Sequence, residues 1–496
     1  MNINETLALI KAAHAGEEGL SDLRKSLTTA SGIVNYDLQA PSKNLYPVIT
    51  PLRNKIPRVG GNGGTATNWK VISGLTGSGI TSMGWVPEGQ RSGRMNYSAT
   101  PKSATYVTLG EEDSITEEAV NAAIGFEDAQ ARMTMRLLQQ TMIKEEFAIL
   151  GGNKTVALGT PATPTLSAAS GSSTLGTATH YVNVVALTLE GFNAASVTGG
   201  VKQATVITGA DGDTYTLNGG SSAASAEASV SVTATNNLLM DVAAVPGAVG
   251  YAWYVGTTTG NAKLQAITTL NSYTLTALTT THQNITAITA DCSLNAVYAF
   301  DGLLSTALAS GSGAYVKTFA TGTVNVGTKM TTTSAGGVVE IDTMLKSMWD
   351  NNRVSPSILL VNAQEMNSIK KLVLADGASA SLLRVQTSGT EPYAIVANGN
   401  VVGYYNPFAM GGGSVIAISL HPFVPAGTIL AWAENLPTQY QSSETPNVAE
   451  MHIRKDYVQT IWPQKTRKRE TGVYTEEVLA VYAPFAMGVL NNIAPS

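Results

Sequence analysis

Regular and irregular patterns of apolar and polar residues divide the chain into segments. Residues 1–30 carry apolar side chains at helical spacing among charged ones, which predicts one or two short helices. Periodicity then disappears over residues 36–59. Four prolines fall in this stretch: Pro41, Pro47, Pro51 and Pro57. Because proline interrupts helices and strand ladders, we predict an extended arm that completes the segment 1–59.

The arm and the segment after it, residues 60–107, are predicted to contact a second subunit. Residues 60–107 begin with glycines and continue as two alternating stretches, Thr67–Ile72 and Ser103–Leu109. These predict a long hairpin with a polar tip around residues 87–94. Neither segment has the regular apolar pattern needed for a core of its own. We therefore expect both to contribute to assembly, and little to the stability of a single chain.

The strongest helical pattern lies within residues 108–157. Ser114 and Glu117 have the spacing of a capping box. Apolar residues then recur at helical intervals as far as a pair of glycines. Gly125 is expected to bend or interrupt this pattern, which leaves a helix over residues 126–150.

Residues 158–290 differ abruptly in composition from the rest of the chain. They contain two basic and five acidic side chains, and threonine, alanine, serine and glycine dominate. Short alternating stretches between turn signals predict a β-sandwich. Within residues 250–256 the odd-numbered side chains share one face of a strand and the even-numbered ones the other. We expect this module to fold on its own.

The remainder of the chain mixes helices and strands. Val338–Trp349 and Ala363–Leu374 predict helices on either side of a buried strand, Ser357–Asn362. Residues 441–496 alternate strongly, which predicts a long hairpin. Its turn carries four basic residues: Lys465, Arg467, Lys468 and Arg469. The whole chain is therefore predicted to be an α+β protein.

Composition and charge narrow the class of protein. With 496 residues, 44% of them apolar and 13% charged, the chain has the balance of a globular protein of several domains. Its net charge of −5 argues against a dedicated nucleic-acid binder. We expect no signal peptide, no membrane span and no membrane partner. The single cysteine, Cys292, excludes a disulfide framework within the chain and is expected to be a buried free thiol.

The side chains that carry catalysis or bind metals are not arranged for either role. The five histidines are scattered, with none at metal-ligand spacing. No serine-hydrolase elbow occurs, and residues 322–329 depart from a phosphate-binding loop because Thr328 stands where lysine is required. The acidic pairs at 111–112 and 145–146 are interpreted as solvated faces or as ion-pair partners. We predict no enzyme activity, no metal and no cofactor.

The order of these segments resembles the major capsid protein family of tailed bacteriophages, which has the Hong Kong-type fold. The resemblance rests on the arm, the glycine-rich loop, the long helix that ends in EEFAILGGN, the later FDGLL, and the helix–strand–helix around Val354–Leu372. It implies these segments: an N-terminal helix and extended arm over 1–59, an extended loop over 60–107, a spine helix over 108–157, a peripheral domain over 291–336 and 441–496, and an axial domain over 337–440.

The module at 158–290 has a resemblance of its own. Val245–Tyr251, followed by a strand, a turn and Ser272–Leu275, looks like a fibronectin type III or immunoglobulin-like domain. It interrupts the join between the spine helix and the peripheral domain, as accessory domains do in some members of the capsid family. The resemblance implies an inserted domain, which we expect to project from the outer surface of a shell.

The capsid resemblance also implies a function and partners. Copies of the chain would assemble as hexamers and pentamers into an icosahedral head shell that encloses double-stranded DNA without reading its sequence. The implied partners are further copies, a portal, and scaffolding or decoration proteins. The implied location is the virion, after assembly in the cytoplasm of the bacterial host. Two alternatives stay open: an encapsulin-like protein container, and a β-rich structural protein of a phage tail or adhesin.

Nine residues are candidate contacts between subunits. Basic residues on the arm are expected to pair with acidic groups of the adjacent subunit, and tryptophans of the loop to be buried against it. The basic turn has three open roles: contact with DNA, pairing with a neighbour, or a solvated turn. The candidates are Pro51, Arg53, Lys55 and Arg58 on the arm, Trp69 and Trp85 on the loop, and Lys465, Arg467 and Arg469 in the turn.

Overall fold

The computed structural model describes residues 46–61, 63–77, 85–333, 336–375, 401, 403–409, 413–437 and 447–495. The helices predicted in residues 1–30, the first part of the arm, and part of the segment 337–440 lie outside these ranges. The chain divides into two compact units. One contains residues 1–47 and 115–132, and the other contains residues 48–114 and 133–496.

The smaller unit holds the junction between two helices, α4 (Glu117–Ala122) and α5 (Ala129–Gly151). Gly125 lies between them with a φ of 85°, a backbone conformation that favours glycine. The helix α5 begins after Asp128, whose carboxylate accepts two backbone N–H groups of the first turn at 3.0 Å. The predicted interruption at Gly125 is confirmed.

The start of α4 differs from the sequence prediction. Ser114 lies within strand β4 (Val107–Thr116) and therefore caps no helix. The cap is Thr116, whose hydroxyl accepts a hydrogen bond from the backbone N–H of Ala119 at 3.2 Å. The predicted capping box at Ser114 and Glu117 is wrong, because the strand continues past the serine.

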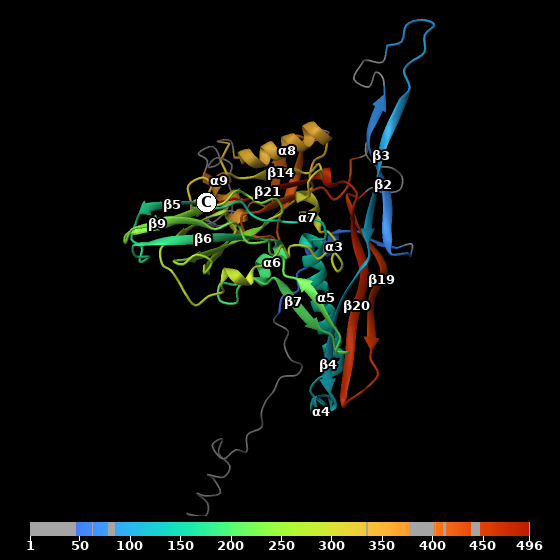
Figure 1. The fold of residues 1–496 in the computed structure, drawn as a ribbon. Coiled ribbons are helices and arrows are strands. Elements are labelled where there is room, and N and C mark those ends of the chain that lie inside the picture. The colour runs from blue at the N-terminus through green and yellow to red at the C-terminus, as the bar shows by residue number, and fades with distance from the viewer. Residues whose placement is uncertain are drawn as a thin grey trace, which may run out of the picture. The chain divides into compact units, whose positions relative to one another are not determined.

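The larger unit contains a mixed sheet of six strands in the order β14-β21-β18-β15-β17-β16 (Figure 1). Strand β15 pairs with β17 in parallel and with β18 antiparallel. The strands come from all three segments that the sequence assigns to the peripheral and axial domains. Their bounds are β14 Tyr315–Thr318, β15 Ile358–Val361, β16 Gly403–Asn406, β17 Ser414–Leu420, β18 Ile429–Trp432 and β21 Met487–Asn491.

Both faces of this sheet are buried. Successive residues of β15 point to opposite sides, so Ile358 packs in one apolar cluster and Leu359 in another. The first, which we call the main cluster, includes the end of α5 and helix α7 (Leu303–Leu308). The second includes helices α8 (Val339–Asn352) and α9 (Ala363–Ala375). The predicted helix–strand–helix is therefore confirmed.

A second sheet, of four strands, has the order β1-β19-β20-β4. Two of its strands, β19 (Ala449–Ile461) and β20 (Lys468–Val481), form the long hairpin predicted near the C-terminus, and the basic turn joins them. Strand β1 (Arg58–Gly60) joins β19 in parallel. Short 3-10 turns lie at Ile285–Ala287 and Pro484–Ala486.

The hairpin predicted in the extended loop is present, but its second arm is shifted. Its strands are β2 (Ala66–Gly77) and β3 (Met95–Thr105), which pair antiparallel with Trp69 opposite Lys102. The stretch from Val107 onward, which was expected to continue the hairpin, instead forms β4 beside β20. In Figure 1 the β2–β3 hairpin extends away from the sheets of its unit.

The arm is not extended throughout. Residues Pro51–Lys55 form a short helix, α3, before β1. Pro51 takes the first helical position, where its missing N–H costs no hydrogen bond and its fixed φ suits a helix. Leu52 and Ile56 are buried in the main cluster. The predictions of a wholly extended arm that adds little to the stability of a single chain are therefore wrong.

Residues 158–290, the segment that the sequence predicts to be an insertion and that we call by that name, contain two antiparallel sheets, one in the order β13-β10-β5 and one in the order β12-β11-β6-β9. Apolar side chains from both form one cluster, which includes the fully buried Trp253. On β11 the odd-numbered residues face this cluster and the even-numbered ones another, as predicted. The bounds are β5 Thr165–Ser170, β6 Ala178–Leu187, β9 Ala228–Val232, β10 Asn236–Asp241, β11 Gly250–Gly256, β12 Lys263–Thr268 and β13 Ser272–Leu275.

A further hairpin of the insertion belongs to neither of these sheets. Between β6 and β9 the chain forms helix α6 (Leu189–Ala194) and then the strands β7 (Ala204–Thr208) and β8 (Thr214–Asn218), which pair only with each other. In Figure 1 β7 runs toward α5 and the β4–β20 edge of the four-stranded sheet.

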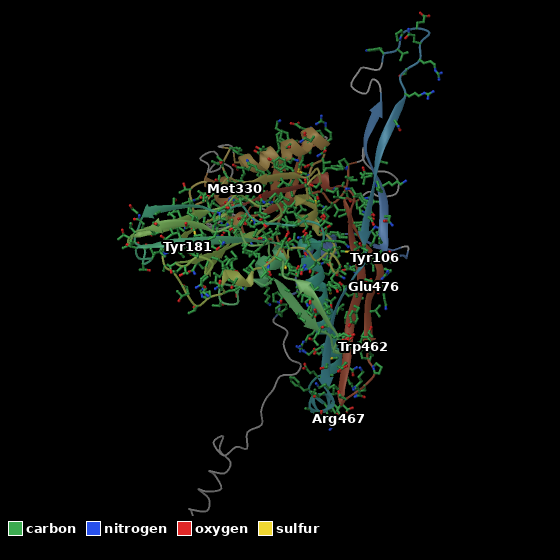
Figure 2. All side chains as sticks on the ribbon, in the orientation of Figure 1. Tyr106, Tyr181, Met330, Trp462, Arg467 and Glu476 are labelled. Carbon is green, nitrogen blue, oxygen red and sulfur yellow. The ribbon has the colours of Figure 1, made fainter. Side chains whose placement is uncertain are left out.

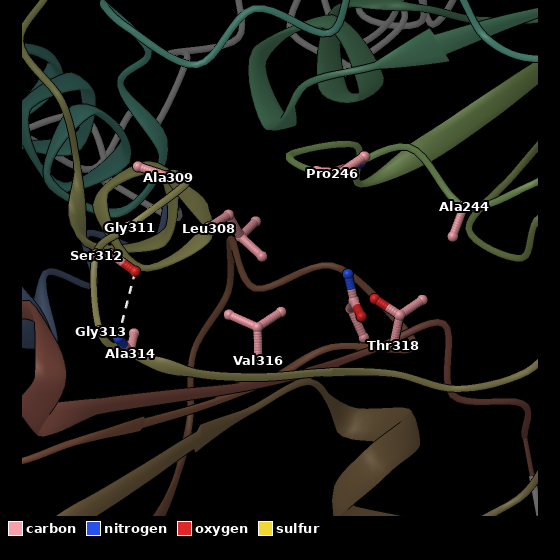
Figure 3. A pocket seen from close by; sticks show the side chains of 11 residues that line it. Ala244, Pro246, Leu308, Ala309, Gly311, Ser312, Gly313, Ala314, Val316 and Thr318 are labelled. Carbon is pink, nitrogen blue, oxygen red and sulfur yellow. Dashed lines mark hydrogen bonds between the residues drawn. The ribbon is translucent and has the colours of Figure 1, made fainter. Parts of the chain in front are cut away.

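The insertion also shares a core with the rest of its unit. The backbone N–H of Asn271 donates to Asn492 Oδ1 at 3.1 Å, and Asn492 Nδ2 donates to Asn271 Oδ1 at 2.9 Å. Leu189 and Val249 are buried in the main cluster. A cavity of about 300 Å³ remains between the loop of Pro246 and strand β14 (Figure 3).

Replacing residues 158–290 by a short Gly/Ser linker is therefore expected to weaken the remaining chain. Loss of Leu189 and Val249 uncovers apolar side chains, at about 1.5–3 kcal/mol for each of the two residues. Urea unfolding should give a free energy lower by about 3–6 kcal/mol than that of the full chain. The variant L189A/V249A, which keeps the insertion, should reproduce part of this loss. Equal stability of the shortened and full chains would contradict the shared core.

Candidate assembly surface

Three carboxylates are buried beside the arm: Glu145 and Glu146 on α5 and Glu477 on β20. A buried carboxylate is costly unless hydrogen bonds and cations satisfy it. Here the arm supplies several of these partners, because its backbone and its two arginines face the carboxylates. We call Glu145, Glu146, Glu477, Arg53 and Arg58 the arm cluster.

Glu146 caps the arm helix from another element. Its two oxygens accept the backbone N–H groups of Leu52 at 2.8 Å and Arg53 at 2.7 Å. Thr50, at the cap position of α3, makes no side-chain capping bond. The carboxylate therefore satisfies N–H groups that the start of a helix leaves without partners. His421 Nε2 also lies 2.7 Å from Glu146 Oε1.

Glu145 binds both arginines of the arm. Arg53 Nε donates to it at 2.8 Å, and Arg58 Nη1 and the Tyr457 hydroxyl donate to it as well. Arg58 also reaches Glu477, with 3.4 Å between Nη2 and Oε2. Both guanidinium groups lie over the ring of Tyr457, 5.2 and 5.4 Å from its centroid. These contacts join the arm, α5, β19 and β20 at one point.

The charge state of the arm cluster depends on pH. The pKa of Glu477 is raised to about 8, mainly by burial and next by the nearby Glu145. Arg58 has the opposite effect on this pKa but does not outweigh them. At neutral pH Glu477 is therefore largely protonated, which limits the negative charge buried in the cluster. Burial and Glu145 also raise the pKa of Tyr457, so its hydroxyl stays a donor.

The basic residues of the arm find acidic partners in their own chain. Lys55 Nζ lies 2.7 Å from Glu434 Oε1, and Arg53 and Arg58 bind within the arm cluster. These residues were predicted to pair with acidic groups of an adjacent subunit. The structure instead pairs them within their own chain, because the arm folds back onto α5. Contact of Pro51 and these three residues with another subunit stays a prediction.

The two candidate tryptophans have different environments. The Trp69 ring packs edge-on against Tyr482 of the same chain, with 5.4 Å between centroids and 81° between planes. Trp85, at the far end of the β2–β3 hairpin, is 87% exposed. All of residues 85–94 are exposed with it. Trp69 therefore supports the fold of the single chain, whereas Trp85 offers a surface for another molecule.

The candidate basic residues Lys465, Arg467 and Arg469 lie together and exposed where β19 turns into β20. Figure 2 shows Arg467 at this end of the hairpin and Trp462 farther along it. The indole Nε1 of Trp462 donates to Glu112 of β4 at 3.0 Å. The structure thus brings Arg53 and Arg58 together in the arm cluster, pairs Lys55 with Glu434 outside it, and places the three basic candidates in one turn. The tip with Trp85 forms a third surface.

Other exposed residues were missed in the sequence. Val297 and Tyr298 lie in a turn and are 72% and 51% exposed. The Tyr298 ring contacts that of Tyr215 on β8, with centroids 5.9 Å apart. Cys292 is a free thiol as predicted, but it is only partly buried. Burial and Asp291 raise its pKa.

Among the residues that the structure describes, no group of three or more metal-ligating side chains comes together. Two histidines instead make local contacts: His421 with Glu146, and His452 Nε2 with the Tyr482 hydroxyl at 2.7 Å. Within the described ranges, no helix is both long and apolar enough to cross a membrane.

The chain is similar to known proteins in structure but not in sequence. No family model matches the chain, and no curated protein sequence matches it. The capsid of Myoviridae phage XM1 is similar at 10% identity with a TM-score of 0.41, covering 94% of this chain and 99% of that one. The capsid of cyanophage P-SCSP1u is similar at 8% identity with a TM-score of 0.41, covering 95% and 98%.

A protein of another kind is also similar, at a lower TM-score. The holo-SrpI encapsulin complex from Synechococcus elongatus is similar at 9% identity with a TM-score of 0.34, covering 94% of each chain. All of these TM-scores are below 0.5. The likeness is therefore too distant to assign a function to this chain.

Proposed function

We propose that the chain is the major capsid protein of a tailed bacteriophage and has no catalytic role. In this proposal, copies assemble as hexamers and pentamers into an icosahedral head shell that encloses double-stranded DNA. The order of arm, extended hairpin, long helix and mixed α+β body supports it. The insertion at 158–290 is then an accessory domain, of the immunoglobulin or fibronectin type III kind, on this subunit.

One observation carries the proposal. Every residue from Trp85 to Arg94 is exposed, at the end of a long hairpin that projects from its unit (Figure 1). Trp85 is 87% exposed and Val86 45%. Large apolar side chains displayed on a projecting element are typical of contact with another protein. A repeated contact of this kind between copies of one chain builds a closed assembly when the rotation between neighbouring copies closes on itself.

The proposed partners are other proteins of the particle and the packaged DNA. Further copies of the chain form the shell, a portal occupies one vertex, and scaffolding or decoration proteins attach during or after assembly. DNA on the inner face needs only loose electrostatic contact, because a shell does not read sequence. The place of the protein is the virion, after assembly in the cytoplasm of the host bacterium.

The direct test is electron microscopy of the purified chain and of a Trp85→Ala variant. The wild type is expected to form closed shells, and the variant to stay unassembled at the same concentration while its circular dichroism is unchanged. Truncating a central interface tryptophan typically costs about 2 kcal/mol or more per contact. Val297→Ala, which trims another exposed side chain, serves as the control. Monomers or open filaments from the wild type would contradict the proposed function.

A further inference from the structure

A groove of about 880 Å³ lies between the β7–β8 hairpin of the insertion and the rest of the larger unit. Residues 207–215 of the hairpin form one side. The other sides are residues 110–112 of β4, Lys144 of α5, and the turn region of β19 and β20 from Trp462 to Tyr474. The insertion thus reaches the elements that the proposed function places in the shell itself.

The lining of this groove is acidic and aromatic. Its acidic side chains are Glu111, Glu112, Asp211, Asp213 and Glu470, and its basic ones are Lys144 and Lys465. Lys144 is already paired with Glu111. Tyr215 and Trp462 line the groove and remain 43% and 42% exposed. Carboxylates beside aromatic faces suit a guanidinium group, which binds both.

The two walls of the groove are in electrostatic contact. Glu112 accepts hydrogen bonds from Trp462 Nε1 and from the Tyr474 hydroxyl, so these rings are held in place. Burial and the bond to Glu112 raise the pKa of Tyr474, and Tyr215 and Asp211 of the β7–β8 hairpin add to this rise from the opposite wall. The side chain of Asp211 accepts the backbone N–H of Asp213 at 3.1 Å, which orders the turn.

The chain carries a segment whose charge is opposite to that of the groove. The tip of the β2–β3 hairpin, residues 85–94, contains Arg91 and Arg94 within ten exposed residues, and Glu88 is its one acidic side chain. In Figure 1 this tip lies far from strand β7 within the larger unit, so a chain does not place its own tip in its own groove. A second copy can do so.

We propose that the groove receives the Arg91–Arg94 tip of a second copy, which makes the insertion part of the assembly contact. This inference rests on the proposed function and deepens it. The arginines face the carboxylates of both hairpins, and Trp85 adds apolar contact at the edge. The insertion is then no passive decoration, because the β7–β8 hairpin supplies one wall of the contact between copies.

A charge exchange in the full-length chain tests this pairing. R91E/R94E reverses the tip, D213K/E470K reverses the groove, and the fourfold variant restores opposite charges. Asp213 is chosen because its side chain is exposed and the bond that orders the turn comes from Asp211. The control K70E/K102E makes the same charge change on exposed positions of the same hairpin, away from its tip.

The measurement is the protein concentration at which shells form, followed by light scattering and electron microscopy. Each double variant is expected to raise this concentration about tenfold or more, and the fourfold variant to return close to the wild type. An equal defect in K70E/K102E would mean that net charge alone matters, and the proposal would be wrong. It would also be wrong if R91E/R94E assembled normally, or if the fourfold variant were no better than either double.

Two further comparisons separate this inference from other failures. If a reversed charge prevents folding, as circular dichroism would show, the neutral variants R91Q/R94Q and D213N/E470Q give the same test, with a smaller rise expected from each. Normal assembly of both neutral variants would overturn the pairing. If the wild type forms no shells, the proposed function is wrong. If shells form equally well in all charge variants, only the proposed binding of the tip in the groove is wrong.

Discussion

Glu146→Ala is expected to release the arm and to lower the free energy of unfolding by about 3–5 kcal/mol, the cost of breaking a buried charged contact. The substitution leaves the backbone N–H groups of Leu52 and Arg53 without their acceptors, the first in a buried contact and the second in a partly buried one. His421 Nε2 loses its contact with Glu146 at the same time. Because Leu52 belongs to the main cluster, a loosened α3 also weakens the packing around it.

Two measurements follow this change. Urea unfolding reports the free energy, and limited digestion with trypsin reports the arm, since Arg53, Lys55 and Arg58 are cleavage sites on it. Faster cleavage at these positions is expected in Glu146→Ala under conditions where the rest of the chain stays folded. Glu146→Gln keeps one acceptor but turns an amide donor toward an N–H group, so an intermediate loss is expected.

Gln140→Ala is the matched control for this experiment. Gln140 lies on the same helix but faces solvent, so its truncation should leave both the unfolding curve and the cleavage rate unchanged. If Glu146→Ala behaved like this control, the carboxylate would not hold the arm.

The order of helices and strands was predictable because local patterns determine most of it. The alternation of residues 250–256, the hairpin of β19 and β20, and the interruption at Gly125 each follow from neighbours in the sequence. Errors arose at the ends of elements, where a residue can fit both the pattern of a helix and the pattern of a strand. Ser114 satisfies the spacing of a helix cap, yet the ladder with β20 carries the strand past it.

The arm cluster could not be predicted, because its contacts join residues far apart in the chain. Glu145 and Glu146 were left between two interpretations, solvated faces or ion-pair partners, and the structure supports the second. Nothing near them in the sequence marks residues 50–58 as their partners. A usable signal was Pro51, which is compatible with the first position of a helix as well as with an extended arm.

The hairpin β7–β8 shows the same limit in the insertion. Its strands are short and polar, so the sequence distinguishes them poorly from those of the two sheets. Their pairing with each other is local, but their position beside β4 and β20 depends on contacts across about 100 and about 250 residues of sequence, which no local pattern contains. The sequence therefore suggested an independent module, whereas the structure joins it to the rest of the unit.

Glu477→Gln is expected to reduce the dependence of stability on pH. The pKa of Glu477 is about 8 in the folded chain against an ordinary value of 4.5, so between these values the folded chain holds a proton that the unfolded chain has released. Stability therefore falls as pH rises toward 8, by at most about 1.4 kcal/mol per pH unit for this one group. Above pH 8 both states have lost the proton, and the contribution stops changing.

The groups that face Glu477 determine the size of this effect. Glu145 of α5 disfavours its ionisation, while Arg58 of the arm and the Thr475 hydroxyl of β20 favour it. Asp456 of β19 also binds Arg58, at 3.2 Å, and so competes for the same guanidinium. Ionisation of Glu477 adds a negative charge that Arg58 must share, which weakens its hold on Glu145 and loosens the arm.

The measurement is thermal or urea unfolding of the wild type and Glu477→Gln at intervals from pH 5.5 to 9. The wild type is expected to lose stability relative to the variant up to about pH 8. Trypsin cleavage of its arm should accelerate over the same range, while glutamine, which cannot ionise, keeps the arm in place. Glu476→Gln is the control, because its side chain pairs with Arg454 at 2.7 Å, outside the cluster. Parallel pH profiles for the wild type and Glu477→Gln would show that this proton does not control the arm.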